Sequence, residues 1–261
     1  MSLSYLNKPD LPGSAYVHIP FCRRRCYYCD FPISVAGDRP PLVWLEEYVE
    51  VLCTEITMAP VPEKPLRTVF FGGGTPSLLP VTLLGKILET IEQHLGIAPG
   101  AEISLEIDPG TFTLEQLTAY HKLGINRVSL GVQTFTEELL TIAGRSHSLE
   151  DSKKAIELIR KSDINNFSMD LISGLPHQTL EQWKSSLQTA IKIAPHHISC
   201  YDLVLEPTTV FAKQYEPGTK PLPTDTETAK MYQLADAMLT KAGYEHYEIS
   251  NYAQPGYQCQ H

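Results

Sequence analysis

The sequence contains no long hydrophobic stretch and no excess of basic residues. No apolar run reaches the ~18 residues of a membrane-spanning helix. Lys and Arg number 21 against 30 Asp and Glu, a formal net charge of −9, and this acidic balance argues against nucleic acid as the main partner. Residues 1–13 are polar and contain proline, so they do not resemble a secretory signal. We therefore expect a cytoplasmic protein with no transmembrane segment.

The chain is long and hydrophobic enough for one α/β domain, with 261 residues of which 43% are hydrophobic. Short β-rich runs alternate with helical patterns. The expected strands are Tyr16–Ile19, Thr68–Phe71, Glu102–Ile107, Arg127–Val132, Asn166–Ile172 and His197–Leu203. The expected helices are Leu42–Met58, Val81–His94, Leu114–Leu123, Glu137–Ala143, Leu149–Lys161, Leu180–Ala194 and Thr226–Ala242. This alternation predicts a parallel sheet and a partial (β/α)6 TIM-like barrel, with the site at the C-terminal ends of the strands.

Three cysteines, Cys22, Cys26 and Cys29, lie in one short loop after the first expected strand. Thiolate is the soft ligand of iron–sulfur clusters, so this loop predicts three ligands of a [4Fe–4S] cluster. If no fourth cysteine joins them, one iron stays open for a substrate. A structural zinc site, with His18 as fourth ligand, is the first alternative, but C-x3-C-x2-C is not a usual zinc-finger spacing. A disulfide is less expected, because cytosolic cysteines more often bind metal or catalyse.

The remaining cysteines and a histidine pair have ordinary interpretations. Cys53 falls among apolar helix positions and Cys200 lies within the sixth expected strand, so both are expected in the core. Cys259 has no assigned role. His196 and His197 are adjacent on a strand, where successive side chains point to opposite faces, so they are not expected to bind one metal together. Residues 23–25 are three consecutive arginines, which we interpret as a solvated turn rather than a site for anionic propionates or a reductase.

The cysteine loop and five later motifs resemble one known family. Residues 16–29 are similar to the radical S-adenosylmethionine (SAM) superfamily, and in particular to the branch that holds oxygen-independent coproporphyrinogen III oxidase and the heme chaperone HemW. The later motifs follow in the same order: residues 70–77, 106–109, 129–135, 144–147 and 169–176. The resemblance covers about residue 15 to the end, and its ordered motifs are far more specific than a lone glycine run. It implies a radical SAM core over 1–261, with the barrel at about 15–243.

The resemblance also implies the cofactors, a [4Fe–4S] cluster and SAM, and the residues around SAM. Gly72, Gly73 and Gly74 let the backbone come close to a ligand or form a tight turn; by resemblance they contact the methionyl end of SAM, with Thr75 beside them. The other residues that the resemblance places around SAM are Tyr16, Tyr28, Glu106, Gln133, Arg145 and Asp170. It implies an electron donor of the flavodoxin or ferredoxin class, and it does not decide between one and two SAM molecules.

Two features favour the chaperone over the oxidase within this branch. The oxidase carries a further cysteine two residues after the third, where this chain has Phe31. The oxidase also has a longer segment before its cluster loop. The resemblance therefore implies a protein that carries heme and hands it to a heme-accepting protein. The alternatives are oxidative decarboxylation of coproporphyrinogen III, in porphyrin biosynthesis, and a scaffold that binds the cluster without radical chemistry.

The C-terminal residues resemble the chaperone's approach to an H-N-x-x-Y-W motif associated with heme. Residues 247–253 and 255–261 carry this similarity, and His261 stands at the histidine of the motif. We interpret 244–261 as the start of a truncated C-terminal extension, and we hypothesise that His261 is a heme ligand.

Overall fold

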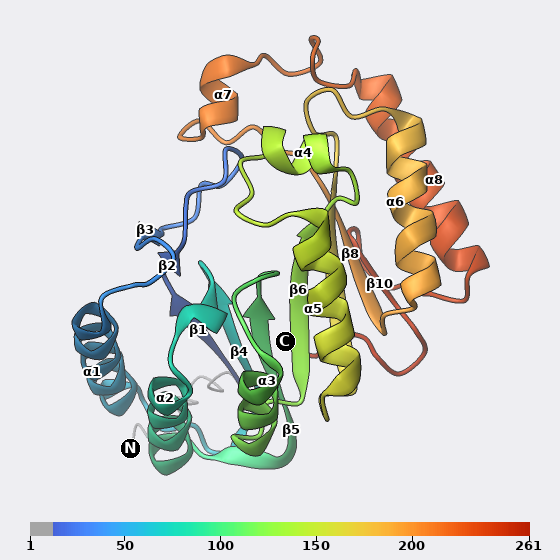
Figure 1. Ribbon diagram of the computed structural model, residues 1–261. Helices are drawn as coiled ribbons and strands as arrows, with labels where there is room; N and C mark the ends of the chain where they lie inside the picture. The colour runs from blue at the N-terminus through green and yellow to red at the C-terminus, as the bar shows by residue number, and fades with distance from the viewer. Residues whose placement is uncertain (1–12) are drawn as a thin grey trace, which may run out of the picture.

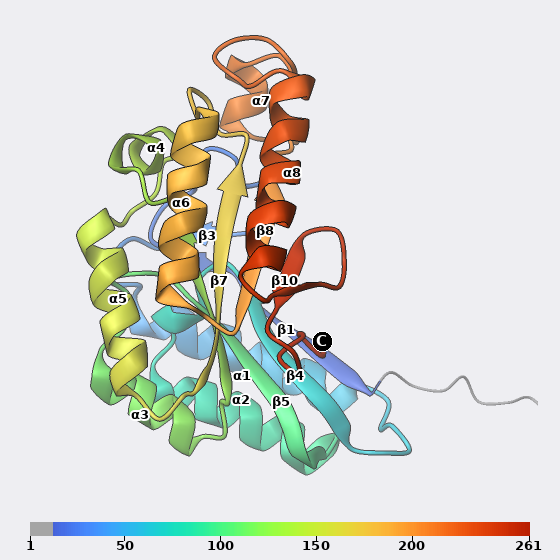
Figure 2. The same cartoon turned by 90° about the vertical axis from the view of Figure 1, so that its right-hand side faces the viewer.

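The computed structural model describes residues 13–261, whose centre is an eight-stranded sheet (Figures 1 and 2). Six strands are parallel and adjacent in chain order, as their pairing registers show. They are β1 (Ser14–Ile19), β4 (Leu66–Gly73), β5 (Ile97–Ile107), β6 (Arg127–Gln133), β7 (Asn166–Ser173) and β8 (His197–Asp202). The α/β fold with a mostly parallel sheet is therefore confirmed, and the strand order is that of a (β/α)6 series.

Helices connect successive parallel strands, as the sequence pattern predicts, and a further helix follows the last of these strands. They are α1 (Leu42–Met58), α2 (Val81–His94), α3 (Leu114–Lys122), α4 (Glu137–Ile142), α5 (Leu149–Lys161), α6 (Leu180–Ile193) and α8 (Asp225–Lys241). Each lies within about a turn of its expected position. A capping box starts α6: the Thr179 side chain accepts from Gln182 N, and the Gln182 side chain accepts from Thr179 N. No helix among residues 13–261 combines the length and apolarity needed to span a membrane.

Several short elements were not expected from the sequence. They are β2 (Phe21–Cys22), β3 (Ser34–Val35), the 3-10 turn η1 (Pro76–Leu78), α7 (Val210–Gln214), β9 (Glu245–His246) and β10 (Asn251–Ala253). Strands of two or three residues are too short to show an alternating pattern. β10 pairs antiparallel with β8 and β9 pairs with β10, so residues 245–253 extend the edge of the main sheet.

The two faces of the sheet differ in chemistry because successive side chains alternate. One face is apolar and packs against the crossover helices; Phe71, Leu105, Val128 and Met169 are fully buried there. The other face carries hydroxyl and charged side chains. The buried ones among them are Thr68, Glu102, Ser104, Arg127, Ser168, His197 and Ser199. The core therefore lies between sheet and helices, and the inner face of the sheet is polar.

The ordinary interpretations of Cys53, Cys200 and the histidine pair are confirmed. Both cysteines are buried in the main hydrophobic cluster. His197 bonds Ser168 Oγ at 2.7 Å and Tyr247 OH at 2.8 Å. The ring of His196 lies instead 4.3 Å from the ring of Tyr257. The two imidazoles thus occupy different surroundings.

Candidate functional site

A cavity of about 380 Å³ lies at the C-terminal ends of the parallel strands, as expected for this class of fold. It brings together residues that are far apart in the sequence. Eleven of the predicted site residues line it: Cys22, Cys26, Tyr28, Cys29, Gly73, Gly74, Thr75, Glu106, Gln133, Arg145 and Asp170. Strand polarity explains this convergence, because each of these side chains follows or ends a strand or belongs to a loop beyond one.

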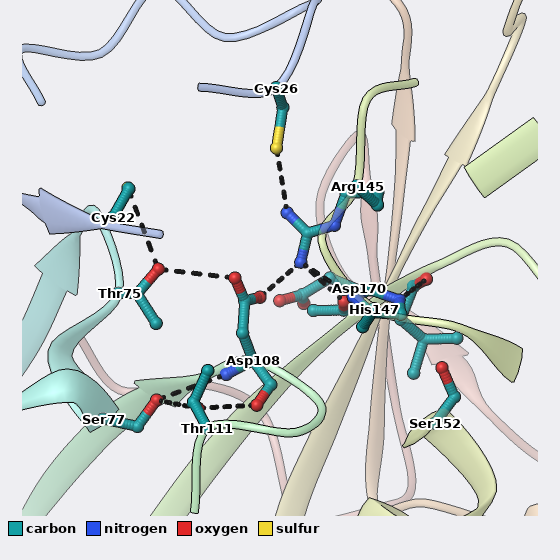
Figure 3. Close-up of polar contacts among 12 residues, drawn as sticks. Cys22, Cys26, Thr75, Ser77, Asp108, Thr111, Arg145, His147, Ser152 and Asp170 are labelled. Atoms are coloured by element: carbon teal, nitrogen blue, oxygen red, sulfur yellow. Dashed lines mark hydrogen bonds and ion pairs between the residues drawn. The ribbon is translucent and has the colours of Figure 1, made fainter. Parts of the chain in front are cut away.

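The three loop cysteines share the cavity wall but differ in their contacts. Cys22 ends β2, and its Sγ lies 3.7 Å from Thr75 Oγ1. Arg145 Nη1 lies 3.3 Å from Cys26 Sγ (Figure 3). Burial raises the pKa of Cys22 to about 12 and also raises the pKa of Cys29. Both thiols are therefore protonated at neutral pH until a cation binds them.

The donor set fits an iron–sulfur cluster better than a closed zinc site. Within residues 13–261 no three His, Cys, Asp or Glu side chains converge on one metal-ion position, whereas a cubane cluster offers separate irons to separate thiolates. His18, the fourth ligand of the zinc alternative, does not line the cavity: its Nε2 bonds the carbonyl of Pro32 at 3.0 Å, and its Nδ1 lies 3.4 Å from Tyr16 OH. The three thiols line the same cavity as the side chains of Glu106, Asp108, Arg145 and Asp170.

The glycine run makes close packing of the cysteine loop possible. Gly73 has a φ of +111°, and a Cβ there would lie 2.5 Å from the His18 ring. A Cβ on Gly74 would lie 2.7 Å from the carbonyl oxygen of Phe21, which is backbone and cannot rotate away. Gly74 N donates to Ile19 O at 2.8 Å. Both glycines therefore form the tight turn after β4, and they also line the cavity.

Asp108 and Arg145 form a partly buried ion pair that the sequence analysis did not include. Arg145 Nη2 donates to Asp108 Oδ1 and to Gly131 O, and the Arg145 side chain is 7% exposed. Asp108 Oδ2 accepts from Thr75 Oγ1 at 3.4 Å. Figure 3 shows a series of contacts that runs from Cys22 through Thr75, Asp108 and Arg145 to Cys26. The signal was present: Asp108 is two residues beyond Glu106, which puts both carboxylates on one side of the chain.

Arg145 carries one buried group without a partner. Its Nε has no hydrogen-bond partner among the described residues, although buried guanidinium groups normally satisfy their donors. The same side chain lines the cavity. A ligand oxygen from a carboxylate or hydroxyl group could accept a hydrogen bond from this Nε–H, and SAM carries both groups.

Two carboxylates on the inner face of the sheet have raised pKa values. Desolvation and the nearby Asp170 raise the pKa of Glu106 to about 8, although Gly73 N donates to Glu106 Oε2 at 3.1 Å. Desolvation raises the pKa of Asp170 to about 6, opposed by hydrogen bonds such as that from Ser129 Oγ at 3.0 Å. A cationic ligand would relieve this crowding of acids. SAM, with its sulfonium and ammonium groups, fits the charge of the cavity.

Gln133 ends β6 in an unusual backbone conformation. Its φ is +69°, in the left-handed region that non-glycine residues seldom adopt. The β6–β7 register shifts between Leu130 and Gln133. Such conformations cluster at functional sites, and Gln133 in this conformation lines the cavity.

Tyr16, Gly72 and His261 lie away from the cavity, on the inner face of the sheet. The Tyr16 ring contacts Gly72, whose added Cβ would lie 2.9 Å from Tyr16 Cε2. Desolvation and Glu106 raise the pKa of Tyr16 to about 12. The His261 ring stacks on Phe70 at 5.1 Å and lies 6.1 Å from Tyr16. Tyr16 therefore lies near both His261 and Glu106, which lines the cavity.

The C-terminal segment reaches this position through two buried charged residues. Arg127 Nη1 donates to the carbonyl of Tyr257 at 3.1 Å, and Gln260 N donates to Glu102 Oε1 at 3.0 Å. Arg127 and Glu102 are 2% and 7% exposed. Both contacts are made to the backbone of the C-terminal segment, so they do not depend on the side chains that this segment carries.

Comparison with known proteins gives consistent matches. The sequence profile of the radical SAM superfamily matches residues 16–190. The heme chaperone HemW of Synechocystis sp. is 55% identical over 96% of this chain, and HemW of Escherichia coli is 39% identical over 96%. The chain spans 61% and 65% of the length of these two relatives. The structure of the radical SAM enzyme coproporphyrinogen III oxidase (HemN) from Escherichia coli matches with a TM-score of 0.82 at 28% identity, over 96% of this chain and 57% of that one. The fold, the cavity at the strand ends and these matches together show that the chain belongs to the radical SAM superfamily.

Proposed function

We propose that this chain is the radical SAM core of a heme chaperone, which binds a [4Fe–4S] cluster and SAM and delivers heme to an acceptor protein. The observation that carries the proposal is the cavity, where three cysteines face two carboxylates of raised pKa and a partly unsatisfied arginine. The similarity to proteins named HemW supports the chaperone role.

The residues have separate tasks in this proposal. When bound, the cluster supplies an electron that cleaves the sulfonium bond of SAM to methionine and a 5′-deoxyadenosyl radical. Cys22, Cys26 and Cys29 hold the irons. Glu106 accepts from the cationic or hydroxyl groups of SAM, and Arg145 binds its carboxylate. We expect a cytoplasmic location, with an electron donor of the flavodoxin or ferredoxin class as a second partner.

Anaerobic reconstitution with iron and sulfide, followed by EPR with and without SAM, tests the proposal. We expect a [4Fe–4S]⁺ signal that changes when SAM is added, because SAM would occupy an open iron. A cluster indifferent to SAM, or a protein loaded only with zinc, would contradict it. SAM cleavage under dithionite then separates a radical enzyme from a non-catalytic scaffold.

SAM affinity is expected to rise with pH up to about 8. Glu106 is mostly protonated below its pKa of about 8, and a bound cation favours its ionised form, so binding at pH 7 releases a proton. Asp170, whose pKa is about 6, should likewise release a proton on SAM binding near pH 6. The charge of Asp108 acts in the opposite direction, because it raises the pKa of Glu106. The dissociation constant should fall by up to about tenfold per pH unit between pH 6 and 8.

Calorimetry in two buffers of different ionisation enthalpy measures this proton release directly. Glu106→Gln keeps the shape of the side chain and removes its charge, so the affinity of this variant for SAM should vary less with pH. The ammonium group of SAM titrates equally in both proteins and cancels in the comparison. Equal proton release by the two proteins would show that Glu106 does not ionise on binding.

Heme binding is expected to depend on His261. Its Nδ1 lies 3.2 Å from Thr68 Oγ1, which leaves Nε2 as the ring nitrogen for iron. His261→Ala should weaken heme binding at least about tenfold and shift the Soret band, whereas exposed His121→Ala should change neither. Unchanged heme affinity and spectrum in His261→Ala would remove this residue from the site.

Coproporphyrinogen III oxidation is the second candidate, because the match to the HemN structure covers nearly the whole chain. Phe31 is against it: this residue lines the cavity, half exposed, where the resemblance puts a cysteine in the oxidase. Anaerobic incubation with coproporphyrinogen III, SAM and a reductant decides between them. Vinyl products would support the oxidase, and intact propionates would support the chaperone.

A further inference from the structure

The segment that follows the third cysteine has little secondary structure of its own to hold it. Residues 29–33 lie between β2 and β3 and form no helix or strand. Backbone groups of such a segment need other partners. Cys29 N donates to Cys26 O at 3.2 Å, and Ser34 N donates to Pro20 O at 2.7 Å. The carbonyl groups between these two points are left to side chains.

Arg25 supplies most of those partners. Its Nη1 donates to Cys29 O at 3.2 Å and to Phe31 O at 3.1 Å, and its Nη2 donates to Ile33 O at 3.2 Å. A guanidinium group suits this role, since its planar fork presents several donors in fixed directions. One side chain therefore gathers three carbonyl groups of the cysteine loop.

The two neighbouring arginines make different contacts. Arg23 Nη2 donates to Gly110 O at 2.6 Å, and Arg23 Nε lies 3.4 Å from Asp38 Oδ1. Arg24 contacts Tyr27, with Nη2 3.5 Å from its hydroxyl and the guanidinium 5.9 Å from its ring. Only Arg25, among these three, binds the backbone around Cys29. Arg25 is exposed, as the interpretation of residues 23–25 as a solvated turn expects, but it also binds the backbone of the cysteine loop.

We propose that Arg25 is a positioning residue, which orders the cysteine loop around Cys29 before the cluster is assembled and keeps it closed afterwards. The inference rests on the proposed cluster site. Ordering a flexible segment is entropically unfavourable, so a loop already ordered in the free protein binds its ligand more tightly. Arg25 acts through the backbone of Cys29 and touches no cysteine sulfur.

Other bonds keep the rest of the loop attached when Arg25 is changed. His18 Nε2 bonds Pro32 O at 3.0 Å, and Ala36 N donates to Cys22 O at 2.8 Å. Arg25 is itself exposed, so its loss leaves no buried charge. The fold should therefore survive its replacement, which separates loop order from global stability.

Arg25→Gln and Arg24→Gln form a matched pair, because each removes one positive charge from the same loop. In the metal-free protein, Arg25→Gln should raise the amide hydrogen exchange of Cys29 and Ser34, whose N–H groups donate to Cys26 O and Pro20 O, about tenfold, since three hydrogen bonds of modest individual strength that order this loop are lost. After reconstitution, it should hold less iron per chain and lose its cluster to a chelator about tenfold faster. Arg24→Gln should match the unmodified chain in all three measurements, and Arg25→Lys should recover part of the loss.

These measurements distinguish a role of Arg25 in ordering the cysteine loop from a role in global stability. Equal exchange and equal cluster retention in Arg25→Gln and Arg24→Gln would overturn the proposal, and so would a fall in melting temperature with exchange raised throughout the chain. If the unmodified chain itself takes up no iron, the proposed function fails. The exchange comparison of the metal-free proteins would still decide whether Arg25 orders the loop.

Discussion

Replacing Cys26 with alanine is expected to abolish [4Fe–4S] incorporation. Cys22, Cys26 and Cys29 are the cysteines that line the cavity, so a loop with two thiolates leaves two irons without protein ligands. Iron and sulfide per chain should fall to the level of a mock reconstitution. So should the absorbance at about 400 nm that is usual for such clusters. Cys22→Ala and Cys29→Ala should behave in the same way.

Cys259→Ala is the control for this loss. Cys259 is partly buried near Glu102 and does not line the cavity among the described residues, so its removal should leave iron content unchanged. Full iron content in all three cavity variants would exclude the cluster assignment. Stoichiometric zinc that disappears in His18→Gln would favour the zinc alternative.

Replacing Arg145 with methionine should destabilise the protein strongly. It leaves the carboxylate of Asp108, which is 22% exposed, without its cation. Loss of one partner of a fully buried pair lowers the free energy of unfolding by about 3–5 kcal/mol, which is the upper bound for this partly buried pair. Urea denaturation followed by circular dichroism measures the loss. SAM binding should weaken as well, because the same guanidinium donates toward Cys26 and Tyr28.

Two further variants test the cause. Arg145→Met combined with Asp108→Asn should recover part of the stability, since no unpaired charge then remains. Lys153→Met, which removes an exposed pair with Glu150, should have little effect. A single Arg145→Met variant as stable as Lys153→Met would show that the pair contributes nothing to the fold.

Much of the fold follows from local pattern. The six parallel strands and the seven expected helices occupy their expected positions, because hydrophobic periodicity and capping residues act over a few neighbouring positions. β9 and β10 carry too few residues for such a pattern, and their pairing with β8 depends on contacts distant in the chain. The proposed boundary near residue 244 stays a prediction.

The sequence by itself determined which residues follow the parallel strands, and strand polarity then brings them to one end of the sheet. That is why the cysteine loop, Glu106, Gln133 and Asp170 meet in one cavity. Only the tertiary structure decided the partners. The pairing of Asp108 with Arg145, the carbonyl groups around Arg25 and the path of the C-terminal segment over Glu102 depend on side-chain directions and long-range packing. Such contacts join residues that are far apart in the chain, so the local sequence around each residue does not predict them.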